Sequence, residues 1–259
     1  MLKFAANLSM LFTEYDFLER FDQAAQAGFR GVEYLFPYDF DVEIIKTKLE
    51  ENKLQQVLFN LPAGEWDAGD RGIAVDPNRI EEFQLGVAKA IEYAKVLGNT
   101  QVNCLAGIVP QGVTQQDAHT TFIINLRYAA QQLEAAGITL VIEAINTRDI
   151  PGFFLNTTQQ AQSVIAEVGS NNVFVQYDIY HMQIMEGDLS PTIANNLSRI
   201  AHIQLADNPG RHEPGTGEIN YDFLLPHIDE LGYQGWIGCE YKPKAGTHQG
   251  LSWLNAFQQ

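Results

Sequence analysis

The sequence predicts an α/β fold, a single (β/α)8 barrel formed by residues 1–259. Three observations favour this fold: eight short apolar runs typical of strands, a helical pattern after each run, and a length typical of one such barrel. Nearly continuous apolar strands that alternate with helices indicate a parallel sheet with both faces buried. Eight such units most simply close into a barrel.

The predicted strands and helices alternate along the whole chain. The strands are predicted at residues 3–9, 31–36, 54–61, 100–107, 139–146, 173–180, 200–207 and 235–242. In the first helical stretch, YDFLERFDQAAQAG, Phe17, Phe21 and Ala24 recur at helical spacing, and Gly28 stands where a helix commonly ends. Further helices are predicted at residues 41–52, 79–97, 114–136, 157–168, 190–198, 220–231 and 247–257.

An open doubly wound sheet is the alternative arrangement of these elements. The first turn between strand and helix has no GxGxxG sequence, so nothing favours a dinucleotide site in such a sheet. The closed barrel is therefore the preferred fold.

Composition and charge restrict the classes of function. The formal net charge of −16 opposes nucleic-acid binding, which depends on Lys and Arg that neutralise phosphates. No apolar run approaches the roughly 20 residues that cross a bilayer, and MLKFAANLSMLF lacks the pattern of a signal peptide. Cys104 and Cys239 lie far apart and outside any CxxC pair, which suggests neither a disulfide framework nor a thiolate zinc site. We therefore expect a soluble cytoplasmic protein that binds neither nucleic acid nor membranes.

Polar side chains occur near the carboxyl ends of four consecutive predicted strands. They are Glu143, Asp178, Gln204 and Glu240. In a barrel these strand ends meet at one mouth, where the chemistry of such folds takes place. Three carboxylates in a poorly solvated mouth would repel one another unless a cation lies among them. Oxygen ligands favour Mg²⁺ or Mn²⁺ over zinc, although His181 leaves some scope for other metals.

For any one of these residues alone, a hydrogen-bonded polar group at a strand end explains the pattern equally well. Asp178 and His181, three residues apart in QYDIYH, also fit a helix cap and a satisfied core histidine. The prediction of a divalent metal site therefore depends on the four strand-end residues taken together.

Seven stretches of the sequence resemble hydroxypyruvate isomerases, within the xylose isomerase-like TIM-barrel superfamily. They are FAANLSMLF, LFPYDF, NLPAGEWDAGDRGIAVDP, INTRDIPGFFLNT, QYDIYHMQIMEG, ADNPGRHEPGTGEINY and GWIGCEYKP, and the resemblance runs nearly from end to end. It implies that Glu143, Asp178, Gln204 and Glu240 bind the metal, and that Glu143 and Glu240 also donate and accept protons. One position departs, because Ala144 stands where proline is expected in close relatives and can shift the aim of Glu143 slightly.

The implied reaction interconverts hydroxypyruvate and tartronate semialdehyde by moving a proton between adjacent carbons through a cis-enediolate. A bound divalent metal would stabilise the negative charge of the enediolate. Glu143 and Glu240, on opposite faces of the substrate, would remove and return the proton, while Asp178 and Gln204 complete the coordination. Neutral Gln204 limits the negative charge that meets an anionic substrate.

Three further residues are candidates for substrate binding. His181 can donate a hydrogen bond to a substrate oxygen or orient a metal ligand, and Arg211, in the loop NPGRHEPGTGEIN, can pair with the substrate carboxylate. Lys242 is the rival for that carboxylate. A buried core histidine and a solvated loop arginine are the respective alternatives for the first two. His202, two residues before Gln204, is expected one layer deeper in the core.

The segment after the third predicted strand, residues 62–78, is neither strand nor regular helix. Loops of this length are usually lids or disordered, and Trp66 with three glycines favours a lid that excludes water from the enediolate. A rim loop packed in a subunit interface is the alternative. Phe12, Phe36 and Trp253 are candidates to line the pocket, although core packing is the more common role of such aromatics.

Other functions remain open. A related sugar-acid or ketose isomerase or epimerase, such as a 2-oxo-tetronate isomerase, would use the same four ligands with a different pocket rim. A metal-dependent endonuclease of the same superfamily would be expected to show more histidine ligands and a basic groove, and the acidic composition counts against it. A sugar-binding barrel without activity would not need two carboxylates in acid/base positions. The expected partner is a small anionic hydroxy-oxo acid, and the sequence leaves open whether the chain forms a homo-oligomer.

Overall fold

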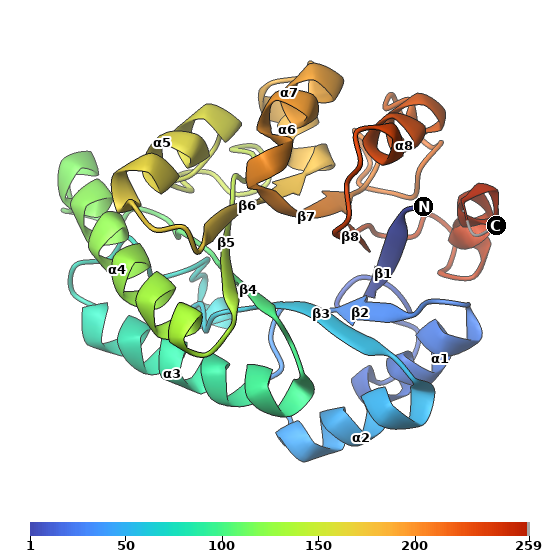
Figure 1. Ribbon diagram of the computed structural model, residues 1–259, viewed down its shortest axis with the longest axis horizontal. Coiled ribbons are helices and arrows are strands. Elements are labelled where there is room, and N and C mark those ends of the chain that lie inside the picture. The colour runs from blue at the N-terminus through green and yellow to red at the C-terminus, as the bar shows by residue number, and fades with distance from the viewer. Residues whose placement is uncertain (258–259) are drawn as a thin grey trace.

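The computed structural model describes residues 1–257, in which eight strands form one closed parallel barrel in sequence order (Figure 1). The strands are β1 (Lys3–Asn7), β2 (Gly31–Glu33), β3 (Gln55–Asn60), β4 (Gln101–Cys104), β5 (Thr139–Glu143), β6 (Val173–Asp178), β7 (Ile200–Leu205) and β8 (Trp236–Cys239). Pairing of β1 with β8 closes the ring. The predicted (β/α)8 barrel is confirmed, and each strand lies inside its predicted range.

Helices surround the barrel on its outside, as Figure 1 shows. They are α1 (Arg20–Gln26), α2 (Val42–Asn52), α3 (Ile80–Leu97), α4 (Gln115–Ala135), α5 (Thr158–Val168), α6 (Ile179–Met185), α7 (Leu189–Asn196) and α8 (Tyr221–Glu230). Short 3-10 helices lie at Phe17–Glu19, Trp66–Ala68 and Leu197–Arg199. The last predicted helix is a 3-10 helix at Gln249–Ala256, where Gly250 in the first turn disfavours regular α-helix.

α6 was not predicted, because the sixth strand was expected to continue to residue 180. Asp178 ends β6 and at the same time caps α6, since its Oδ1 accepts a hydrogen bond from the backbone amide of His181 at 3.1 Å. The helix-cap alternative for Asp178 is therefore correct. Strand and helix join without an intervening loop, which holds Asp178 firmly at the mouth of the barrel.

The barrel interior changes from apolar to polar along its axis. Trp236, the first residue of β8, lies against Gly31, where an added Cβ would come within 2.7 Å of the indole ring. Residues two apart on a strand share a face, so His202 lies beneath Gln204 and Gly238 lies beneath Glu240. His202 is fully buried, as predicted, but it belongs to a polar layer rather than an apolar one.

Two further observations concern the surface and the thiols. No helix within residues 1–257 combines the length and the apolar character that crossing a membrane requires. Cys104 and Cys239 are free and buried, and burial raises the pKa of both thiols.

Candidate active site

A cavity of about 100 Å³ lies at the carboxyl ends of the strands. Polar side chains from both halves of the barrel line it, namely Asn7, Glu33, Asn60, Glu143, Gln176, His181, Gln204, Arg211 and Glu240. Asp178 lies directly behind this lining, because its Oδ2 is 3.6 Å from His181 Nε2 and 3.8 Å from Arg211 Nη2. The structure thus brings all four predicted metal ligands to one place.

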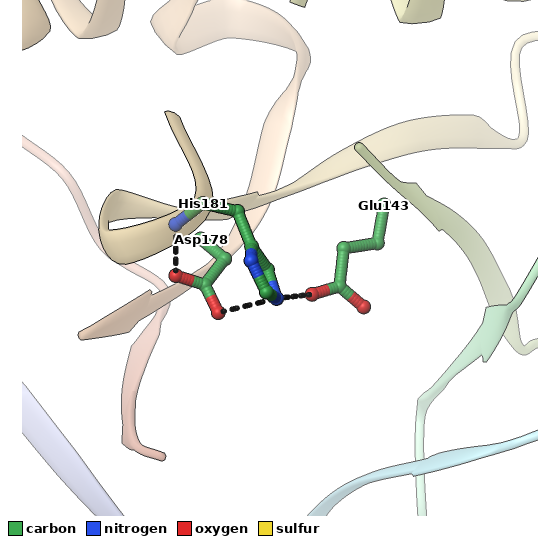
Figure 2. A group of neighbouring side chains, drawn as sticks. All are labelled: Glu143, Asp178 and His181. Atoms are coloured by element: carbon green, nitrogen blue, oxygen red, sulfur yellow. Dashed lines mark hydrogen bonds and ion pairs between the residues drawn. The ribbon is translucent and has the colours of Figure 1, made fainter. Parts of the chain in front are cut away.

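Glu143, Asp178 and His181 form the tightest cluster at this cavity. One ligand atom from each lies within 4.8 Å of the other two, and all three side chains are buried. Figure 2 shows the imidazole ring between the two carboxylates. Its Nε2 is 3.9 Å from Glu143 Oε1, so His181 stands where a substrate or a cation at the carboxylates would meet it.

Arg211 connects Glu240 with Asp178, because its guanidinium lies near both carboxylates. Arg211 Nη2 donates to Glu240 Oε2 at 2.5 Å, and Nη1 lies 4.0 Å from Asp149 Oδ2. The backbone of Arg211 has a φ of +52°, and its carbonyl accepts a hydrogen bond from the amide of Lys242 at 2.8 Å. This fold of the loop turns the guanidinium toward the cavity, so the solvated-loop alternative for Arg211 is wrong.

Lys242 lies differently. Its side chain is exposed and does not line the cavity, while its backbone holds the Arg211 loop in place. A role for the Lys242 side chain in substrate binding stays a prediction. Phe12 is fully buried and Trp253 packs edge-on against Phe4 with ring centres 5.5 Å apart, so both belong to the core rather than to the cavity.

Gln204 reaches the cavity from β7, and both ends of its amide have partners. Its Nε2 donates to Glu33 Oε1 at 2.7 Å, and its Oε1 accepts from Gln176 Nε2 at 2.6 Å. These two hydrogen bonds orient the Gln204 amide with its NH₂ group toward Glu33 and its oxygen away from Glu33.

Burial and like charge perturb the acids of the site. Burial raises the pKa of Glu143 well above its usual range, and the neighbouring carboxylates of Glu240 and Asp178 raise it further. Burial also raises the pKa of Glu240 to about 8, although Arg211 lowers it in part. Burial lowers the pKa of His181 to about 4, so this imidazole is neutral at neutral pH. Carboxyl groups that hold a proton near neutral pH suit general acid/base work, and a cation would favour their ionised form.

Asn146 determines which nitrogen of His181 carries the proton. Asn146 Oδ1 accepts hydrogen bonds from the backbone amides of Arg148 and Asp149 at 3.0 and 2.7 Å, so its Nδ2 must face the imidazole. That Nδ2 lies 2.6 Å from His181 Nδ1 and donates to it. A neutral imidazole that accepts at Nδ1 carries its proton on Nε2, which is the nitrogen facing Glu143 and Asp178. In this tautomer His181 is a hydrogen-bond donor to the cavity, not a metal ligand.

Several residues of the site were not predicted from the sequence. Asn7, Glu33, Asn60 and Asn103 lie within one residue of the ends of β1 to β4, as the predicted ligands lie within one residue of the ends of β5 to β8. The same criterion, a polar residue at the end of an apolar strand, identifies these four when it is applied to the first half of the barrel. Asn146 carries no comparable signal, because its role depends on a turn.

Residues 62–78 contribute Trp66 to the wall of the cavity. The indole ring packs against Phe36 with ring centres 5.1 Å apart, and the Arg71 guanidinium lies 4.3 Å from its centre. At the base of the segment, Gly72 and Gly107 approach so closely that a Cβ on Gly72 would be 2.8 Å from the backbone nitrogen of Gly107. Trp66 also lines a second cavity of about 600 Å³ beside Phe36. Movement of this segment as a lid stays a prediction.

A closed (β/α)8 barrel with buried carboxylates, a histidine and an arginine at the carboxyl ends of its strands defines a TIM-barrel enzyme. The chain belongs to the xylose isomerase-like TIM barrel family, whose model matches residues 21–257.

Comparison with known proteins adds detail to this family membership. The chain is 56% identical to the hydroxypyruvate isomerase of Escherichia coli K12 and covers 100% of both chains. It is 47% identical to a 2-oxo-tetronate isomerase of Cupriavidus necator, over 99% of each chain. Among solved structures, a Brucella melitensis protein described as an AP endonuclease of family 2 has a TM-score of 0.97 at 45% identity, with 100% of both chains covered. The curated relatives place the chain among the isomerases.

Proposed function

We propose that this enzyme interconverts hydroxypyruvate and tartronate semialdehyde with the assistance of Mg²⁺ or Mn²⁺. The observation that carries the proposal is the presence of two glutamates with raised pKa values, Glu143 and Glu240, in the lining of one small cavity. The 56% identical hydroxypyruvate isomerase of E. coli supports this choice of substrate.

The side chains of the site fit a divalent cation. Three carboxylates and one side-chain amide lie at or directly behind the lining of this cavity, and carboxylate and amide oxygens are the hard donors that Mg²⁺ and Mn²⁺ prefer. Arg211 is the guanidinium that faces Asp178 and Glu240 within 4 Å, so the negative charge exceeds the positive charge here. When bound, the cation would polarise the substrate carbonyl and stabilise the charge of the enediolate.

The chain's own residues then move the proton. One of Glu143 and Glu240, in its carboxylate form, removes a proton from C3 of hydroxypyruvate, and the electrons of the C–H bond form the enediolate double bond. The other glutamate returns a proton to C2, while the hydroxyl proton of C3 passes to the oxygen on C2. The two glutamates exchange roles with the direction of the reaction.

His181 and Arg211 hold the substrate in this scheme. The proton on His181 Nε2 points into the cavity, where it can be donated to a substrate oxygen. The Arg211 guanidinium can pair with the substrate carboxylate through two parallel hydrogen bonds. Trp66 closes one wall against water.

The proposal is tested by incubating purified, Mn²⁺-loaded protein with hydroxypyruvate in D₂O and following tartronate semialdehyde by NMR. Deuterium should enter the carbon that accepts the proton. The 47% identical 2-oxo-tetronate isomerase supports a second candidate substrate class, so a panel of 2-oxo-tetronates and ketoses belongs in the same experiment. Faster conversion of a 2-oxo-tetronate than of hydroxypyruvate would favour that second function.

We do not propose an endonuclease. The net charge of −16 opposes approach to a polyanion, and a cavity of about 100 Å³ suits a compact acid rather than a nucleotide.

A further inference from the structure

A buried carboxylate that the proposed reaction does not use lies beneath the metal site. Glu33, at the end of β2, is 1% exposed, and its Oε2 lies 2.7 Å from Nε2 of the fully buried His202. A buried contact between a carboxylate and an imidazole is weak evidence for stability, because apolar residues of similar volume usually serve as well or better. Its presence here calls for another role.

The barrel wall is shaped around this carboxylate. Gly238, on β8, faces Glu33, and a Cβ at Gly238 would lie closer to the carboxylate than any atoms can pack. On the far side of His202, Gln101 Nε2 lies 3.3 Å from His202 Nδ1, so the imidazole lies between the amide of Gln101 and the carboxylate of Glu33. Glu33 therefore has a defined position in the polar layer beneath the predicted metal ligands.

Glu33 Oε1 accepts hydrogen bonds from two side-chain amides. Asn7 Nδ2 donates to it at 2.9 Å and Gln204 Nε2 at 2.7 Å. An ionised carboxylate can only accept hydrogen bonds, so both amides must turn their NH₂ groups toward it. The oxygen of Gln204 then points away from Glu33, where it accepts from Gln176 and keeps a second lone pair.

This orientation matters because the two ends of an amide are nearly equal in size but not in chemistry. An amide oxygen binds a hard cation, whereas an NH₂ group repels it. We propose that Glu33 is a positioning residue, which fixes the Gln204 amide with its oxygen toward the cation and, through Asn7, also holds Glu240. The link to Glu240 is the hydrogen bond from Asn7 Nδ2 to Glu240 Oε1 at 3.2 Å. This inference rests on the proposed metal-assisted function.

The first test is Glu33→Gln. An amide at position 33 can donate as well as accept a hydrogen bond. It therefore no longer forces the NH₂ group of Gln204 to face position 33. Residues that orient metal ligands typically contribute about 10-fold to 100-fold in metal affinity, and we expect a loss of this size in the Kd for Mn²⁺. Electron paramagnetic resonance of free Mn²⁺ gives this Kd for the full chain, and the measurement does not depend on enzyme activity.

An exchange of the carboxylate and the amide between positions 33 and 204 distinguishes a loss of amide orientation at position 204 from general structural damage. In the double variant Glu33→Gln with Gln204→Glu, the carboxylate at position 204 offers oxygen at both ends, so its orientation no longer matters. The amide at position 33 can donate to it, and the total charge is unchanged. We expect Mn²⁺ affinity to return to at least the wild-type level, whereas Gln204→Glu alone places two carboxylates in contact and should not reach it.

Glu186→Gln is the matched control. Glu186 accepts hydrogen bonds from the amide and hydroxyl of Thr158 at the start of α5, and it does not line the cavity. This variant should lose thermal stability and keep the wild-type Kd for Mn²⁺.

The outcomes distinguish this inference from the proposed function. Unchanged Mn²⁺ affinity in Glu33→Gln would overturn the role of Glu33, and so would a loss that the double variant fails to restore. If Glu33→Gln does not fold, the double variant decides alone: wild-type affinity supports the role, and a tenfold or larger loss overturns it. A wild-type chain that binds no Mn²⁺ overturns the metal site and this inference together.

Discussion

The two halves of the barrel mouth carry different chemistry. At or next to their carboxyl ends, β5 to β8 carry Glu143, Asp178, Gln204 and Glu240, whereas β1 to β4 carry Asn7, Glu33, Asn60 and Asn103. We call these the carboxylate half and the amide half. All eight side chains are buried, so each must find partners at the mouth or in the layer beneath it.

The hydrogen bonds show how the two halves cooperate. Asn103 Nδ2 donates to Glu143 Oε2 at 3.1 Å, and Asn7 Nδ2 donates to Glu240 Oε1 at 3.2 Å. Asn60 Oδ1 accepts a hydrogen bond from the same Asn103 Nδ2 at 3.1 Å, and this contact fixes the orientation of the Asn103 amide. Each predicted acid/base glutamate therefore has a neutral donor from the opposite half. The comparison indicates that the carboxylate half supplies most of the charge, whereas the three asparagines of the amide half orient the glutamates without adding charge, and Glu33 is the one carboxylate in that half.

The largest expected effect concerns the whole carboxylate half. Exhaustive chelation should abolish turnover, because the clustered carboxylates then lack the cation that balances them, and added Mg²⁺ or Mn²⁺ should restore it. A coupled assay of tartronate semialdehyde formation measures both steps. Full activity in a demonstrably metal-free preparation would contradict the metal site.

Next in size are single substitutions of the two glutamates. Glu143→Gln and Glu240→Gln keep an oxygen for the metal and lose the basic carboxylate, so Mn²⁺ should still bind while turnover falls by about 10²-fold to 10⁴-fold. Turnover and deuterium exchange into substrate are measured beside Glu186→Gln as the control. Wild-type exchange in either variant would make that glutamate a ligand only, and the base would be sought first at His181.

A substitution in the amide half should have a smaller effect of a different kind. Asn103→Ala removes the donor to Glu143 and leaves every ligand in place, so we expect a loss of about 10-fold to 100-fold in Mn²⁺ affinity. Asn99→Ala is the control, because Asn99 is equally buried but lies before β4, at the opposite end of the barrel. Equal Mn²⁺ affinities in the two variants would contradict a division of labour between the halves.

The carboxylate half also predicts how stability changes with pH in the chelated protein. A folded-state pKa of about 8 for Glu240, and the raised pKa of Glu143, stabilise the folded chain at low pH, and this stabilisation is lost as the pH rises toward the folded pKa. Burial of His181 affects stability in the opposite direction, because its lowered pKa makes the folded chain more stable as the pH rises. This effect is confined to the range between its folded pKa of about 4 and its ordinary pKa of 6.5.

Between about pH 6.5 and 8 the glutamates therefore dominate. We expect the Tm of the chelated protein to fall across this window, and the slope to flatten in saturating Mn²⁺, because the cation keeps the carboxylates ionised. Calorimetry with and without Mn²⁺ measures both slopes. A Tm that does not fall with pH in the chelated protein would show that the buried glutamates are already ionised.

The smallest expected effect concerns residues 62–78, which extend the amide half after β3. If this segment closes over substrate, saturating hydroxypyruvate should slow proteolytic nicking within it, since lids come from the less stable parts of a structure. Gel analysis of limited digests gives the rate. Equal rates with and without substrate would favour a fixed rim loop.

Much of the fold could be predicted because strands buried on both faces give continuous apolar runs. The helix α6 could not, since it follows β6 without a loop and its cap, Asp178, is also a site residue. The carboxylate half was predicted from polar residues at strand ends, and the amide half follows from the same criterion applied earlier in the chain. The placement of Arg211 depends on a left-handed backbone at a residue other than glycine, which no sequence pattern indicates.

Asp178 carries a consequence for protein engineering. One of its oxygens caps α6, and the other faces His181 and Arg211 at the cavity. Loss of a helix cap costs about 0.5–2 kcal/mol, so any replacement here changes foldability and reactivity at once. Directed evolution toward a new metal or substrate should therefore accept changes more readily at Gln204 than at Asp178, which has the lower mutational tolerance of the two.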